Sequence, residues 1–187
     1  MRNDAVERAV ADLIRGLGLD VGAEPELAQT PARVAELYAE LFSGTDLSAR
    51  PAPATFPHEG GGEELVVVRH LPFHSLCVHH LIPFFGHAHI AYVPHRAIVG
   101  ISGPARLLAY HAHRPQLQER LGRQIADHLQ QLLEPRGLAV VLVARHLCME
   151  MRGIRSPGEV VTRIARGVLA EPRWAGLFAE SAPSPGA

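Results

Sequence analysis

Two cysteines constrain this fold more than any other feature, because Cys77 and Cys148 are the only cysteines among the 187 residues. Each lies beside histidine, in the runs Cys77-Val78-His79-His80 and His146-Leu147-Cys148. Two thiolates and one imidazole make a three-ligand zinc site, which leaves a coordination position open for water. A fold that uses this site must bring together two segments that are far apart in the chain.

Three other interpretations of the cysteines stay open at this point. They are a disulfide between Cys77 and Cys148, two buried cysteines that never contact metal, and a closed structural zinc with a second histidine as fourth ligand. The N-terminus lacks the apolar core of a signal peptide, which weighs against the disulfide. The neighbouring histidines weigh against cysteines that only fill the core.

The composition predicts a soluble, cytoplasmic protein with a single hydrophobic core. The chain is 47% hydrophobic, and no apolar run approaches the roughly 20 residues needed to cross a bilayer. The formal net charge is -1 with acidic and basic residues interspersed, which argues against a general nucleic-acid surface. We therefore expect a small-molecule partner, with no nucleic acid and no membrane.

The first part of the chain predicts a helical hairpin. Apolar residues recur at helical spacing over 3–17, and a second helix follows Thr30 as N-cap with Pro31 as its first residue. We divide the chain into an N-terminal helical region at 1–45, a linker at 46–63, a catalytic domain at 64–180 and a disordered tail at 181–187.

The body of the chain is predicted to contain strands on both sides of two consecutive helices. This order indicates an α+β fold, with helices packed on one face of an antiparallel sheet. The predicted elements are strands at 65–68, 86–93, 97–101 and 137–144, a helix opening at Ser102, a helix over 116–133, a continuation of the last strand over 149–154, and a short helix near 171–180.

Several runs in this order resemble the signatures of the GTP cyclohydrolase I family. They are residues 73–86 around Cys77, His113 to Leu121, and Arg145 to Gly153, and Thr30 to Ala35 matches the helix before the catalytic domain. The resemblance extends from about residue 5 to 180. It implies the tunnelling fold, in which an antiparallel sheet with two helices assembles into pentameric rings. Two rings then stack into a homodecamer whose active sites lie between subunits.

The resemblance also implies a role for each matched position. The zinc ligands fall on Cys77, His80 and Cys148, and the catalytic histidines on His79 and His146. The carboxylate that anchors guanine falls on Glu119, with Gln118 beside it. The residues that remain of the triphosphate grip are Arg33, Ser102, Arg106 and Arg152.

The chemistry implied by the family suits these residue types. Zinc lowers the pKa of a bound water toward 7, which supplies hydroxide to open the imidazole ring of a purine. His146 would protonate purine N7, and His79 would handle protons near the ribose. The family thereby converts GTP and water to 7,8-dihydroneopterin triphosphate and formate for folate or pterin synthesis.

The chain departs from the family pattern around the phosphates and beside the metal. Gly103 and Glu36 stand at usual lysine positions, and Val78 replaces a usual glutamate. Residues 156–163 also differ from the expected Ser/Thr-rich stretch. Fewer cations weaken the grip on roughly four negative charges, since charge-assisted hydrogen bonds contribute about 1 to 3 kcal/mol each. We therefore expect a lysine restored at Gly103 to tighten GTP binding.

The sequence is compatible with three functional hypotheses. The first is a GTP cyclohydrolase I. The second is a diverged paralogue that acts on a guanine compound with fewer phosphates, or stops at the ring-opened formamidopyrimidine, in specialised metabolism. The third is a non-catalytic, zinc-stabilised ring protein that binds a purine. The remaining histidines are expected to be structural or solvent-exposed, namely His87, His89, His95, His111, His113 and His128.

Overall fold

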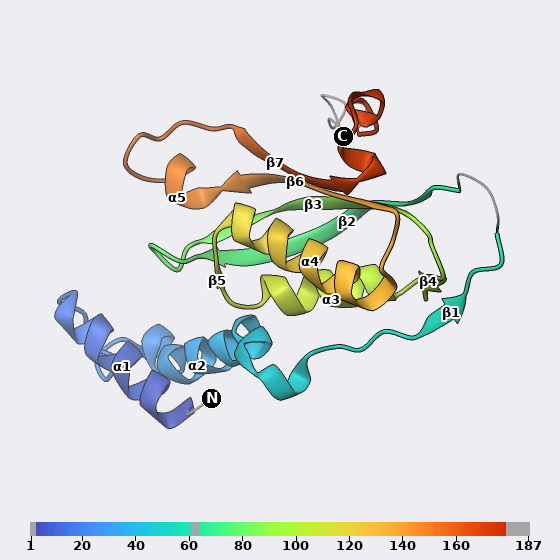
Figure 1. Ribbon diagram of the computed structural model, residues 1–187. Coiled ribbons are helices and arrows are strands. Elements are labelled where there is room, and N and C mark those ends of the chain that lie inside the picture. The colour runs from blue at the N-terminus through green and yellow to red at the C-terminus, as the bar shows by residue number, and fades with distance from the viewer. Residues whose placement is uncertain (1–2, 61–63, 179–187) are drawn as a thin grey trace.

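The structure, a computed structural model, describes residues 3–60 and 64–178. Its centre is a five-stranded sheet, with α3 (Gly103–Ala112) and α4 (Gln118–Leu133) on one face and an N-terminal helical pair at one end (Figure 1). The α+β class, with helices on one face of an antiparallel sheet, is therefore confirmed. Among the described residues, no helix has the length and apolar character needed to cross a membrane.

The strand order in the sheet is β5-β2-β3-β6-β7. The four long strands run antiparallel to their neighbours, and β5 (Pro115–Gln116) pairs in parallel with the end of β2 at Leu76 and Cys77. β5 covers only that end of the outer edge of β2, and β7 pairs on one side only within the described chain. The long strands are β2 (Val66–Cys77), β3 (Pro83–Val93), β6 (Gly137–His146) and β7 (Glu159–Gly167).

The main core lies between the sheet and the two helices. Alternate residues of the central strands face the helices, because side chains of a strand point to opposite faces in turn. Those of β3 meet the apolar stripe of α4, and both sets are almost completely buried. They are Phe84, Ala88, Ile90 and Tyr92 from β3, and Leu121, Ile125 and Leu129 from α4.

A second, two-stranded sheet lies beside the main one. It pairs β1 (Thr55–Pro57) with β4 (Ala97–Val99). The segment 46–63, predicted as a linker, therefore contributes a strand that is tied to the body. The division of the chain into domains stays a prediction.

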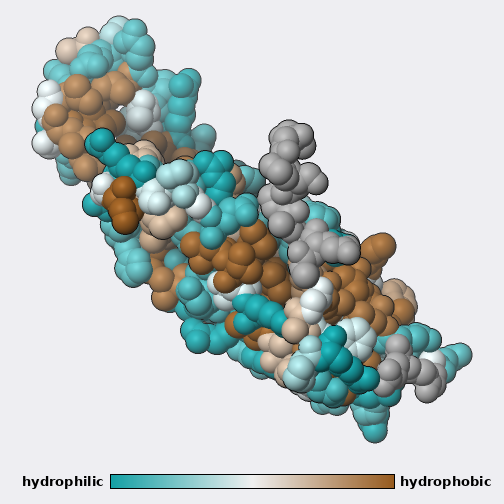
Figure 2. Space-filling view, turned by 90° about the horizontal axis from the view of Figure 1, so that it is seen from above, coloured by the Kyte–Doolittle hydropathy of each residue, from teal (hydrophilic) through white to brown (hydrophobic). Residues whose placement is uncertain are grey.

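The N-terminal hairpin consists of α1 (Asn3–Gly16) and α2 (Thr30–Leu41). The N-cap assignment was wrong by one residue, because Thr30 is already helical and Gln29 precedes it without a side-chain cap. Proline needs no hydrogen-bonded N–H in the first helical turn, so Pro31 is tolerated there. The hairpin leaves apolar side chains exposed, and Figure 2 shows hydrophobic surface on it. The exposed leucines are Leu13, Leu17, Leu19 and Leu37.

The prediction that a strand continues over 149–154 was wrong. The chain forms the short helix α5 (Leu147–Glu150) instead, because the pairing of β6 with β3 ends at His146, opposite Phe84, and β3 itself begins at a proline. Proline cannot donate to a further rung of the ladder. The strand β7, which no predicted element covered, follows from Glu159.

The end of the described chain also differs from the prediction. A 3-10 turn at Pro172–Trp174 stands where a helix near 171–180 was expected, and residues 179–187, with the predicted disordered tail, lie outside the described part. The other 3-10 turns are Pro25–Leu27, Ser43–Thr45, Leu47–Ala49 and Val168–Ala170.

Candidate active site

The first half of the predicted metal group lies in the turn between β2 and β3. Cys77 is the last residue of β2, and its carbonyl accepts from the backbone N–H of Leu81 at 2.8 Å. Leu81 has a positive φ of 52°, which tightens the turn. This turn directs His80 back toward the cysteine that opens it.

The second half of the predicted metal group is Cys148, which lies in α5 directly after β6. The ligand atoms of Cys77, His80 and Cys148 all lie within 4.8 Å of one another, and within the described residues no further histidine, cysteine or carboxylate joins this group. Both cysteines are free thiols, so the disulfide interpretation is not supported. The three predicted ligands therefore come together within one chain.

The donor set suits a zinc ion. Burial, and next the neighbouring Cys77, raise the pKa of Cys148, because two thiolates side by side repel each other in a poorly solvated place. A divalent cation between them removes that penalty, and two sulfurs with one imidazole are typical zinc ligands. Three protein ligands rather than four also match a site that keeps a position open.

Two further predicted residues border this group. The Nδ1 atom of His79 lies 3.7 Å from Sγ of Cys77, and the side chain is exposed. The Nη1 atom of Arg152 lies 2.8 Å from Nε2 of His80. A positive guanidinium thus stands directly beside the metal group, where an anionic substrate could reach it.

His146 is held firmly at the end of β6. Its ring stacks on Phe84 with a centroid distance of 4.7 Å and an interplanar angle of 3°. Its Nε2 atom lies 2.7 Å from Oε1 of Gln118. Burial lowers the pKa of His146, while Glu119 and Glu150 act in the opposite direction. Arg145 holds the Glu150 carboxylate through two hydrogen bonds, of 3.0 and 2.6 Å.

The short strand β5 places the start of α4 next to the metal group. Gln116 pairs with Cys77, and α4 begins two residues later. Gln118 is buried and contacts His146, so a direct contact of its side chain with substrate stays a prediction. Glu119 is exposed in the first turn of α4, and no hydrogen bond or ion pair to it is found among the described residues.

The predicted phosphate residues do not gather at the metal group of the same chain. Ser102 and Arg106 lie at the N-terminal end of α3, next to β4, and Figure 1 shows β4 at the opposite end of the sheet from α5. Arg33 lies on α2 and is exposed. Only Arg152, among these four, touches a metal-group residue.

Gly103 stands where the family usually has lysine, and its neighbours leave no room for a side chain. The sequence alone did not reveal this. Gly103 is buried, and a Cβ atom added there would lie 2.4 Å from Cγ2 of Val99 and 3.0 Å from Cβ of Pro53. Carbon atoms cannot approach to 2.4 Å without something moving. A lysine at Gly103 therefore requires room that Val99 now fills.

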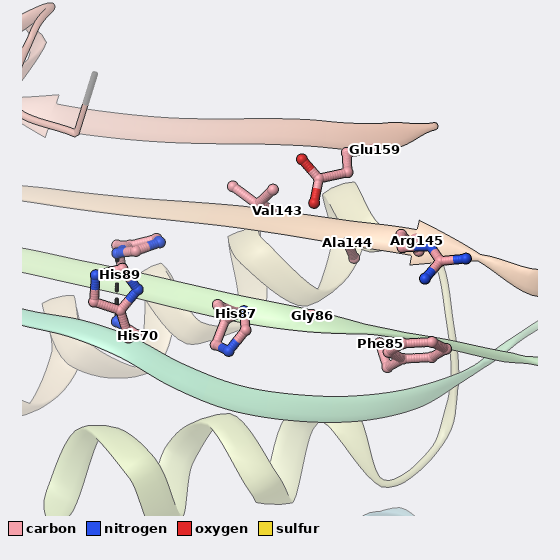
Figure 3. Close-up of a pocket in the computed structure, with 9 residues that line it drawn as sticks. All are labelled: His70, Phe85, Gly86, His87, His89, Val143, Ala144, Arg145 and Glu159. Carbon is pink, nitrogen blue, oxygen red and sulfur yellow. Dashed lines mark hydrogen bonds between the residues drawn. The ribbon is translucent and has the colours of Figure 1, made fainter. Parts of the chain in front are cut away.

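A separate cavity of about 190 Å³ lies on the sheet face that α3 and α4 leave uncovered (Figure 3). His70 has a positive φ of 57° at a bulge in β2, and its ring lies 4.9 Å from that of His89. Burial lowers the pKa of His89 to about 4. The cavity contains none of the predicted site residues. Its lining is His70, Phe85, Gly86, His87, His89, Val143, Ala144, Arg145 and Glu159.

Comparison with known proteins gives one consistent family. The family profile described as GTP cyclohydrolase I matches residues 6–180. The GTP cyclohydrolase 1 of Lysinibacillus sphaericus is 47% identical over 168 residues, covering 89% of this chain and 88% of the relative. That of Bacillus subtilis is 44% identical over 170 residues, covering 90% and 88%.

A more distant likeness is to a solved structure, the apo form of the archaeosine synthase QueF-Like. It is 18% identical with a TM-score of 0.42, and the match covers 56% of this chain and 95% of that one.

Proposed function

The chain belongs to the GTP cyclohydrolase I family, and from this premise we propose that it hydrolyses the imidazole ring of GTP, yielding 7,8-dihydroneopterin triphosphate and formate. The observation that carries the proposal is the meeting of Cys77, His80 and Cys148 within 4.8 Å, beside His146. A role in folate or pterin synthesis and a cytoplasmic location accompany the proposal as predictions.

Cys77, His80 and Cys148 would hold a zinc ion. When bound at such a site, zinc lowers the pKa of a coordinated water toward 7 and supplies hydroxide at neutral pH. The protein buries Cys77 and leaves Cys148 half-buried at the edge of the core, so that solvent screens the charges that develop there less than it would at the surface. Exposed His80 leaves a side open for a substrate to approach.

The remaining residues would bind the purine and move protons. Glu119 would accept from guanine N1–H and the 2-amino group, which adenine cannot offer together. His146 would deliver a proton to purine N7, and His79 would exchange protons near the ribose. The contact of Arg152 with His80 supports a role in holding the nearest phosphate.

A homo-oligomer would complete the site. Ser102 and Arg106 lie at the far end of the sheet from the metal group, so a neighbouring copy would have to supply them. The open edges of β2 and β7 offer unpaired backbone groups for pairing with another copy. Contact between copies would also bury the exposed leucines of the N-terminal hairpin. We propose the homodecamer of two pentameric rings, which native mass spectrometry would count directly.

A diverged paralogue is the second candidate, favoured by one observation. Gly103 is buried against Pro53 and Val99, and Glu36 on α2 is exposed, so neither position offers a cation to a triphosphate. A substrate with fewer phosphates, or a reaction that stops at the formamidopyrimidine, would be compatible with this loss. A non-catalytic ring protein would have no use for the ordered His146.

The test is to incubate the zinc-loaded protein with GTP, GMP, guanosine and guanine, and to follow formate release together with pterin fluorescence. Formate and fluorescence from GTP alone support the first candidate. Activity on GMP or guanosine supports the diverged paralogue, and so does a product one water heavier than GTP, detected by mass spectrometry, with no formate released. Formate without fluorescence shows that the reaction stops after loss of the formyl group and before closure to the pterin. If no guanine compound yields formate or a ring-opened product one water heavier than the substrate, the proposed hydrolysis is wrong.

A further inference from the structure

The amide of Gln118 has its orientation fixed by its neighbours. The side chain is 2% exposed, and its Nε2 atom lies 3.1 Å from the carbonyl oxygen of Leu142 and 2.8 Å from that of Val160. Carbonyl oxygens only accept, so the amide nitrogen donates to both and its two hydrogens are used. A flipped amide would press its oxygen against two carbonyl oxygens, which excludes the other orientation.

This orientation determines where His146 carries its proton. The Oε1 atom of Gln118 lies 2.7 Å from Nε2 of His146, and an amide oxygen can only accept. The Nε2 atom must therefore bear hydrogen whether the ring is neutral or charged. Nδ1 is left as the one ring nitrogen at which His146 can take up and release a proton.

The same glutamine also fixes the surroundings of that ring. Gln118 is the first residue of α4, so its bonds to Leu142 and Val160 tie the helix to β6 and β7. Glu119 follows it directly. Gln118 thus helps to set the distance between the imidazole of His146 and the carboxylate predicted to anchor guanine.

We propose that Gln118 is a positioning residue, which holds the proton of His146 on Nε2 so that Nδ1 exchanges protons with the purine. This inference rests on the proposed function, and it replaces the direct substrate contact that the family resemblance implies for Gln118. The amide has no hydrogen left to donate to guanine, because both point to the sheet.

The first test needs no substrate and no turnover. The zinc-loaded protein is labelled with ring-¹⁵N histidine, and His146 is assigned by the signals that disappear in His146→Ala. The expected spectrum shows a protonated Nε2 and a bare Nδ1 for the neutral ring. A neutral ring with its proton on Nδ1 and a bare Nε2 in the wild type would overturn the proposal, whatever reaction the protein performs.

The second test separates positioning from binding. Gln118→Met keeps the length of the side chain but removes the acceptor, and we expect kcat to fall about 10- to 100-fold with KM nearly unchanged. Gln118→Glu keeps an oxygen that can accept from His146, and in its protonated form it donates to one carbonyl. It should therefore recover part of the lost kcat.

The matched control is Gln116→Met, because Gln116 is equally buried but bonds to the carbonyl of His111 and to Gln124 and Arg120 rather than to His146. It should lower stability and leave kcat at the wild-type level. A rise in KM without a fall in kcat in Gln118→Met would overturn the proposal in favour of direct binding. Equal kcat losses in both methionine variants would overturn it in favour of general loosening.

Discussion

The two ends of the sheet differ in how much of a site one chain assembles. At the end with α5, the metal group, His146, Gln118 and Glu119 lie together within one chain. At the end with β4, Ser102 and Arg106 stand exposed without those partners. Under the proposed function, the residues for ring opening gather within each chain, whereas phosphate recognition would depend on how copies meet and on what packs around Gly103.

The largest expected effect is at the metal end. Cys148→Ala removes one of the three proposed ligands, and a site with two protein ligands should not retain zinc, because neither remaining side chain supplies the third bond. We expect activity below detection and no bound zinc by elemental analysis. His87→Asn serves as control, since His87 lines the separate cavity on the uncovered face of the sheet and not the metal group. Full activity in Cys148→Ala would remove the metal group from the mechanism.

His146→Ala should rank second. It removes the proposed proton donor while leaving all three ligands in place, so zinc content should stay at the wild-type level. Loss of general acid catalysis costs about 10²- to 10⁴-fold in kcat. Single-turnover formate release measures this loss. Intact activity would show that the imidazole of His146 is not the proton donor, and the proposed mechanism would then be wrong.

Glu119→Gln tests the base-binding part of the same end. The amide keeps the shape of the side chain but loses the charge, and its NH2 group can face the donors of guanine. We expect kcat/KM for GTP to fall about 10- to 100-fold, as for a charged hydrogen bond worth about 1.5 to 3 kcal/mol. Preference for guanine over adenine nucleotides should shrink in parallel. An unchanged preference would move base recognition elsewhere.

The opposite end is tested by adding a cation where packing forbids it. Gly103→Lys alone should destabilise the protein, because its Cβ would meet Val99 at 2.4 Å. Combined with Val99→Ala, it should lower KM for GTP about tenfold, as expected of one charge-assisted hydrogen bond. The control is Gly103→Ala with Val99→Ala, which opens the same space without charge. Equal KM values in the two double variants would show that a cation at this position does not contribute to GTP binding.

Val78→Glu should have the smallest effect. Val78 is 36% exposed in the turn beside Cys77, so a carboxylate there is largely solvated. Exposed charges contribute about 0 to 1 kcal/mol, which corresponds to a change of up to about fivefold in kcat. Steady-state kinetics would detect it. A change above a hundredfold would mean that this side chain reaches the reacting atoms.

Hydrophobic patterns in the sequence predicted the helices and strands whose apolar residues recur with a clear period. They did not predict the elements whose place depends on pairing with another strand. The stripe of α4 and the apolar run of β6 were read correctly because burial on one face demands those residues. β7 was missed, because the exposed Val161 interrupts the alternation of apolar and polar residues, and Arg163 and Arg166 leave no continuous apolar run. Its place is decided by the ladder it forms with β6 from Gly137 to Arg145. The end of β6 at His146 was likewise set by where β3 begins.

The sequence by itself determined the chemistry that is available, since the residue types of Cys77, His80 and Cys148 fix the donor set wherever the chain places them. The tertiary structure decided which neighbouring residues surround these side chains. Only the fold shows that Gln118 faces His146 rather than solvent, because two carbonyls from neighbouring strands orient its amide. Only the fold shows that Gly103 is closed, by Val99 nearby in the chain and by Pro53, which lies far away in it. Both results depend on contacts between distant segments, and such contacts leave no local pattern in a single sequence.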